Sequence, residues 1–205
     1  MGLALAASDE PRVSGSEGVS DLLARAARGE NAAWRELLER YAPRVFALAR
    51  SRSASAELAE EITQSVFVTV SAKLGDGGYD ERGRFESWLF RVAMNRLRDE
   101  ARRVKRQARV SDPESFTSIP GENGTGGHAQ TDSLDALREA VGSLGEADKE
   151  IIHLRHHAQM SFRQIADLLD EPLGTLLARH HRALRKLKQI MSEQPGTGTD
   201  NGSGS

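Results

Sequence analysis

Hydrophobic residues along this chain recur mainly with the period of an α-helix. The first clear stretch predicts an amphipathic helix with one apolar face, made of Trp34, Leu37, Leu38, Tyr41, Val45 and Leu48. Pro43 is expected to end or kink that helix, because proline lacks a backbone N–H and clashes with the preceding turn. The pattern predicts an all-α protein.

Two further apolar stretches precede residue 100. From Ala59 to Val70 the apolar positions share one helical face, and the acidic residues around Glu57 favour a helix start. The alternation of Val66, Val68 and Val70 leaves a strand open for the same stretch. A glycine-rich loop over 74–84 comes next. A strongly amphipathic helix then begins at Phe85 and runs into a basic stretch that ends at Arg109.

The C-terminal part predicts a helix-turn-helix. Helices are expected over 134–143, 146–156, 161–170 and 173–190, and Ser161 with Gln164 matches a capping box. The inward positions are expected to be Ile165, Leu168 and Leu169, followed by Leu173, Leu176, Leu184 and Leu187, with His180 partly buried among them. A helix-turn-helix places its second helix in the DNA major groove. That helix carries five Lys/Arg and no acidic residue.

Composition shifts divide the chain into two domains and three connecting or terminal segments. A Ser/Gly-rich tail over 1–18 is expected to be disordered, and 19–109 forms the first helical domain. The Pro- and Gly-rich stretch 110–133 predicts a flexible linker. The helix-turn-helix domain covers 134–191, and 192–205 is a second disordered tail. The fold class is therefore two small helical domains joined by a linker.

Charge distribution says more than the net charge of −2. Between Arg91 and Arg109 there are eight Lys/Arg and only two acids, which points to local contact with phosphates. The absence of cysteine excludes disulfides and thiolate metal sites and suits a reducing cytoplasm. No apolar run is long enough to span a bilayer and no signal peptide is evident, so we expect a cytoplasmic protein without membrane insertion.

The candidate chemistry is binding rather than catalysis. Phe85, Trp88 and Phe90 alternate with arginines, as in surfaces that stack bases and neutralise phosphates of a single strand, although the aromatics also suit a core. His153 and His157 lie one helical turn apart, but no third ligand accompanies them, so no metal site is expected. No nucleophile–base set stands out. We expect no enzyme activity and no cofactor.

Taken together, four stretches resemble bacterial RNA polymerase sigma factors of the extracytoplasmic-function (ECF) type. This class is the sigma-70 family reduced to its second and fourth regions. The matching stretches are Asp21–Trp34, Ala59–Phe67, Phe85–Asn95 and Ser161–Leu169, with Gly174-Thr175 and Arg182-Ala183 after them. Their order and spacing make the joint match specific. The resemblance implies a transcription initiation factor whose partners are core RNA polymerase and promoter DNA, with an anti-sigma protein as a further candidate.

The resemblance also implies roles for individual residues. The residues expected to bind polymerase are Glu60, Glu61, Gln64 and Phe67. Those expected to contact the melted proximal promoter element are Arg84, Trp88, Arg91, Asn95, Arg98 and Arg102. Those expected to contact the distal element are Arg163, Thr175, Arg179, His181, Arg182 and Lys186.

The chain departs from the family pattern at several of these places. Ser65 stands where the family often has an acid, Leu177 and Ala178 replace a Lys-Ser pair, and His180 replaces an apolar residue. Loss of that lysine predicts weaker or altered distal-element binding. Two other functions stay open at this point. One is a stand-alone helix-turn-helix regulator, which would bind duplex DNA as a dimer. The other is a protein-interaction module whose basic helix is only solvated.

Overall fold

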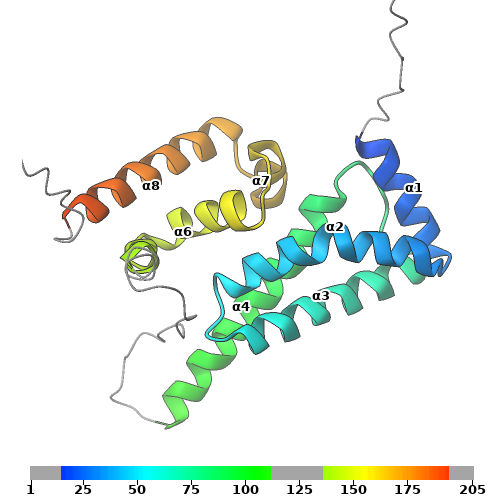
Figure 1. Ribbon diagram of the computed structural model, residues 1–205, viewed down its shortest axis with the longest axis horizontal. Helices are drawn as coiled ribbons and strands as arrows, with labels where there is room; N and C mark the ends of the chain where they lie inside the picture. Colours follow the sequence, from blue (N-terminus) through cyan, green and yellow to red (C-terminus); the bar gives the residue numbers. More distant parts are fainter. Residues whose placement is uncertain (1–14, 112–135, 194–205) are drawn as a thin grey trace, which may run out of the picture.

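The computed structural model describes residues 15–111 and 136–193, and within them all regular secondary structure is helical (Figure 1). The N-terminal unit holds α1 (Gly15–Ala27), α2 (Asn31–Arg50), α3 (Ala56–Gly75) and α4 (Phe85–Ser111). The C-terminal unit begins with a helical segment over 136–142 and continues with α6 (Glu146–Ile152), the π-helix η1 (His153–His157), α7 (Phe162–Leu169) and α8 (Leu173–Glu193). The all-α prediction is confirmed.

In the N-terminal unit the structure excludes an end of the helix at Pro43 and confirms the helix predicted for the stretch after Ala59. α2 continues through Pro43 to Arg50, so the proline does not end the helix. The stretch that left a strand open is helical throughout, because it buries residues at helical spacing (Ala59, Ile62, Val66, Val70) and turns Val68 outward. Ser55 starts α3 as an N-cap, since its side chain accepts a hydrogen bond from the backbone N–H of Leu58.

The core of the N-terminal unit lies between α2, α3 and α4. Tyr41 and Phe90 are fully buried, and the Tyr41 ring meets Phe85 edge-on with centroids 5.3 Å apart. The α1–α2 corner is fixed by the Trp34 indole, which donates to the Ala26 carbonyl at 2.9 Å. This packing buries one side of α4 against α2 and α3.

The C-terminal unit is a helix-turn-helix with the expected cap. The Ser161 hydroxyl accepts from the Gln164 backbone N–H at 3.2 Å, and the Gln164 side-chain oxygen accepts from the Ser161 N–H at 2.8 Å. Asp170 ends α7 in the left-handed conformation, which aspartate tolerates better than most residues. Pro172 precedes α8 directly, where its missing N–H costs no helical hydrogen bond.

The inner stripe of α8 differs from the expectation. Leu176 and Leu187 are buried as expected, and His180 is partly buried. Leu173 and Leu184, however, are 44% and 41% exposed, and Ala183 takes the buried place instead. The reason is geometric: Leu176, Ala183 and Leu187 share one narrow face of α8, and the two exposed leucines lie beside it. Ala183 and Leu187 pack with Ile152 of α6, and Leu176 packs in the larger core.

Several predicted boundaries fall near or beyond the described residues. The predicted N-terminal tail is helical from Gly15, and α4 runs two residues past the expected end of its domain. Most of the predicted linker and of both predicted tails, together with Leu134, lie outside the described residues.

The two units pack against each other. α7 lies against α4, η1 lies against α2, and α6 lies between α8 and the N-terminal unit (Figure 1). Ile151, Leu154, Met160 and Ile165 belong to the same buried cluster as the core of α1–α4. The interface therefore removes apolar side chains from water on both sides.

Candidate nucleic-acid interface

All six residues assigned to the proximal element share one face of α4, which we call the α4 face. Their spacing of three or four residues brings them into line along the helix, from Arg84 just before its start through Trp88, Arg91, Asn95, Arg98 and Arg102. Trp88 is partly buried and the other five are exposed. The alignment places several guanidinium groups in a row beside one large ring.

Trp88 belongs to an aromatic cluster with Tyr79 and Phe85. Its ring lies 4.4 Å from that of Tyr79 and 5.9 Å from that of Phe85, between centroids. Phe85 and Phe90 are buried, so the core interpretation holds for these two, whereas Trp88 is only partly buried. Sequence reasoning missed Tyr79, because it lies in a glycine-rich loop without periodicity. Burial and a hydrogen bond to Glu81 raise the pKa of Tyr79, so its hydroxyl stays protonated and donates to that carboxylate.

Two arginines of the α4 face contact the C-terminal unit. Arg91 donates from Nη2 to the backbone oxygens of Asp167 at 2.8 Å and Leu168 at 3.1 Å, both at the end of α7. Arg98 forms an ion pair with Glu150 of α6, at 2.6 Å between Nη2 and Oε1. Neither contact was predicted from the pattern of residues.

The residues assigned to polymerase binding divide into two groups. Glu60, Glu61 and Gln64 are exposed on α3. Phe67 is only 8% exposed and packs in the core, so its side chain does not belong to this surface. The next residue, Val68, is 69% exposed one turn beyond Gln64 and takes the place expected for Phe67. We call Glu60, Glu61, Gln64 and Val68 the α3 face.

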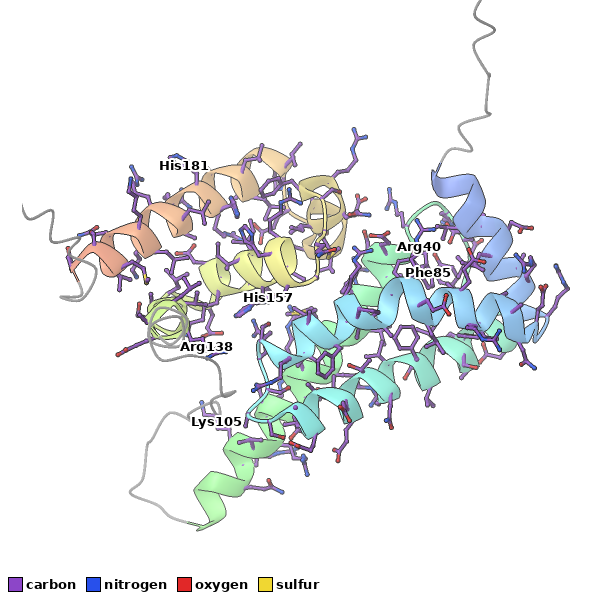
Figure 2. The ribbon with its side chains drawn as sticks, viewed as in Figure 1. Arg40, Phe85, Lys105, Arg138, His157 and His181 are labelled. Atoms are coloured by element: carbon purple, nitrogen blue, oxygen red, sulfur yellow. The ribbon has the colours of Figure 1, made fainter. Side chains whose placement is uncertain are left out.

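On α8, four of the residues assigned to the distal element share one face. Thr175, Arg179, Arg182 and Lys186 follow one another at three or four residues, and we call them the α8 face. Arg179 is held by a bidentate pair with Glu171, at 2.6 and 3.0 Å. His181 lies about 100° around the helix from Arg182 and points away from the N-terminal unit (Figure 2). Arg163 is exposed on α7.

Four histidines of the C-terminal unit have pKa values lowered by burial: His153, His156, His157 and His180. Burial lowers the pKa of His153 to about 3, with smaller contributions from nearby positive charges. His156 and His180 approach to 3.0 Å between their Nε2 atoms, and burial lowers the pKa of each. Within the described residues no three His, Asp or Glu side chains are grouped to hold a metal ion. None of the described helices is long and apolar enough to cross a bilayer.

Two family models match the chain, one for each helical unit. Sigma-70 region 2 matches residues 37–107, and sigma-70 region 4 matches residues 140–189. The ECF RNA polymerase sigma factor RpoE of Cereibacter sphaeroides is 30% identical over 80% of this chain and 88% of its own length. The chain belongs to the ECF sigma factors of the sigma-70 family. Such sigma factors are non-enzymatic transcription initiation factors that bind core RNA polymerase and direct it to promoters, so a stand-alone regulator is not favoured.

Further similar proteins support the assignment of this chain to the ECF sigma factors. SigE of Mycolicibacterium smegmatis is 31% identical, and the match covers 82% of this chain and 66% of that protein. The solved structure of CnrH in complex with the cytosolic domain of CnrY superposes with a TM-score of 0.63 at 25% identity, over 84% of this chain and 96% of the other. The sigma factor RpoE from Bartonella quintana, solved with the anti-sigma factor NepR, shares the fold with a TM-score of 0.62 at 22% identity, over 78% and 98%.

Proposed function

We propose that three faces of this sigma factor bind different partners during transcription initiation. The α4 face holds the melted strand of the proximal element, the α8 face with Arg163 and His181 contacts the duplex distal element, and the α3 face docks on core polymerase. The observation that carries this proposal is the alignment of Arg84, Trp88, Arg91, Asn95, Arg98 and Arg102 on one side of α4.

An aromatic ring beside a row of arginines suits single-stranded DNA better than duplex. A base that has left the duplex can stack on an aromatic side chain, and cations along the same groove neutralise the phosphates. Tyr79 and Phe85 pack against Trp88, so the ring is already ordered and a base that stacks on it would cost little further ordering. In a duplex the bases already stack on each other, and this ring would have no partner.

The α8 face suits contact with duplex DNA. Arg182 and Lys186 are exposed on the second helix of the helix-turn-helix, where phosphate and base edges meet the protein. The pair with Glu171 fixes the Arg179 side chain and limits how far it reaches into a groove. Leu177 and Ala178 are exposed in the first turns of α8, so apolar contact with thymine methyl groups is the chemistry they offer there.

The proposal includes no catalytic step, because binding and strand separation need only the contacts described. It places the protein in the cytoplasm, where polymerase and chromosome lie. A separate anti-sigma protein is a further proposed partner, by likeness to the Bartonella quintana factor that was solved with NepR. Such a partner should stop transcription when added to the purified sigma factor before polymerase.

Reconstituted transcription tests the whole assignment. Purified sigma factor and core polymerase are incubated with genomic promoter fragments, and RNA start sites are sequenced. Discrete starts that share two spaced upstream elements, and that vanish without the sigma factor, are expected. An absence of starts in spite of DNA binding by the chain alone would contradict the assignment.

Trp88→Ala tests the α4 face on a promoter found in this way. The variant should bind polymerase normally but leave fewer thymines of the proximal element reactive to permanganate, because the melted strand loses its stacking partner. Trp34→Ala is the matched control, since Trp34 is the other tryptophan and lies on α2 against the Ala26 carbonyl. Equal loss of melting in both variants would point to a general fault in folding and contradict the role of Trp88.

A further inference from the structure

A cavity of about 390 Å³ lies where α4, α6 and the turn between α2 and α3 meet (Figure 1). α4 and α6 supply its walls, and Arg52 of the turn also lines it. Pockets that take small molecules in proteins measure about 300–1,000 Å³, so this cavity is at the small end of that range. Its size suits one small organic molecule rather than a polymer.

Two glutamates of α6 line the cavity, and each already has a cation beside it. Glu150 forms an ion pair with Arg98 of α4, at 2.6 Å, and Glu146 forms one with Lys149, at 3.1 Å. Both carboxylates are therefore neutralised within the protein. They can still accept hydrogen bonds through their remaining lone pairs, for example from a hydroxyl or an amino group.

The two other arginines of the cavity lack a strong acceptor. The Arg52 side chain is half-buried, yet it has no hydrogen bond or ion pair among the described residues. Its charge is one of the causes, after burial, that lower the pKa of His153 in η1, so the guanidinium lies near the C-terminal unit. Arg102 pairs with Asp99 only at 3.5 Å, where both are largely exposed and the pair is weak. These two guanidinium groups are available to an anion.

The walls between the charges are apolar. Leu97 is buried at the base of α4, and the small side chains of Ala101 on α4 and Ala147 on α6 also line the cavity. A flat ring can lie on such a surface, and the planar guanidinium of Arg98, fixed by its ion pair, can stack on the same ring. The cavity therefore combines a surface for a ring with two cations for an anion.

We propose that this cavity binds a nucleoside monophosphate. The phosphate lies between Arg52 and Arg102, whose two positive charges match the charge of about −1.5 to −2 on a phosphate monoester near neutral pH. The base lies on the apolar wall, and Glu146 and Glu150 accept from its amino group or from the sugar hydroxyls. Because the lining comes from both helical units, the ligand contacts both at once. The site does not depend on the function proposed for the α4 face.

Isothermal titration calorimetry of the full-length chain tests the proposal, with the four ribonucleoside monophosphates as separate ligands at low salt. At least one should bind, with one molecule per chain. Ribose 5-phosphate and inorganic phosphate serve as comparisons, because they carry the phosphate without the base. They should bind at least about tenfold more weakly, since they leave the apolar wall in contact with water.

Two variants, each with a matched control, place the ligand in the cavity. Arg52→Gln should weaken nucleotide binding by about tenfold or more, because a charge-assisted contact to the phosphate is lost. Arg35→Gln is its control, since Arg35 is exposed on α2 and also has no partner among the described residues. Ala147→Leu should abolish binding by filling the cavity. Ala32→Leu is its control, because Ala32 is the exposed second residue of α2, as Ala147 is of α6.

Several results would overturn the proposal. These are the absence of heat with all four nucleotides, binding by Ala147→Leu equal to that of Ala32→Leu, and equal affinity for nucleotide and inorganic phosphate, which would leave only a phosphate contact. Trp88→Ala separates the cavity from the α4 face, because Trp88 does not line the cavity. This variant should bind the nucleotide like the parent. Loss of binding would place the base on the Trp88 ring instead and overturn the cavity site, while it would agree with the function proposed for the α4 face.

Discussion

His153 should make the stability of this sigma factor fall as the medium becomes acidic. The side chain is only 7% exposed in η1, and its Nδ1 atom has no hydrogen-bond partner among the described residues. Burial lowers the pKa of His153 from the ordinary 6.5 to about 3, and the charges of Arg52, His157 and Lys149 act in the same direction. At mildly acidic pH His153 therefore stays unprotonated in the folded protein, whereas it is protonated in the unfolded chain.

The sign and size of the effect follow from that difference. Below about pH 6.5 the unfolded chain binds the proton and the folded chain does not, so the free energy of unfolding falls with falling pH until about pH 3. Each pH unit across this window is worth about 1.4 kcal/mol for one group. Between about pH 7 and about pH 5, His153 should therefore remove about 2 kcal/mol of stability.

Urea unfolding of wild type and His153→Leu at several pH values measures this contribution. The variant should be at least as stable near neutral pH, because leucine removes a buried polar atom without a partner. Its stability should fall less on acidification, by about 2 kcal/mol over the same range. His156, His157 and His180 have pKa values lowered by burial too, so the comparison uses the difference between the two proteins. Parallel pH profiles would refute the assignment to His153.

Three further outcomes are expected. Tyr41→Phe should raise the free energy of unfolding by about 1 kcal/mol in urea titration, because the buried Tyr41 hydroxyl has no partner among the described residues; a destabilised variant would argue against this. Glu61→Lys should weaken binding to core polymerase in a pull-down, while Glu36→Lys on α2 should not; equal affinity of both variants would remove Glu61 from the α3 face. Arg182→Ala should weaken distal-element binding and make its salt dependence shallower by about one unit of slope, and an unchanged slope would exclude a phosphate contact.

Helical periodicity predicted the positions of the main helices because each must bury one face. Helical periodicity could not decide which side chain points into the core where two adjacent residues are both apolar. Phe67 and Val68 differ by about 100° around α3, and only the packing of α3 between its neighbours decides that the phenylalanine points inward. The capping box at Ser161 was predictable because both of its partners lie within one turn of the chain.

Contacts between the two units were not predictable from local pattern. Glu86 and Gln164 are 78 positions apart in the sequence, and neither belongs to a motif that requires the other. Arg91 has no acidic partner within a helical turn, and its acceptors are backbone carbonyls, which every residue carries. Such contacts depend on how two complete units meet, and a residue pattern does not encode that directly.

The same contacts change how the basic residues of this sigma factor should be counted. Arg91, Arg98 and Arg179 each donate to oxygens of the protein, so the proposed DNA binding at these positions would exchange one set of hydrogen bonds for another. The net gain is then smaller than for an arginine that only water surrounds. A count of cations overestimates the affinity of the free chain for DNA.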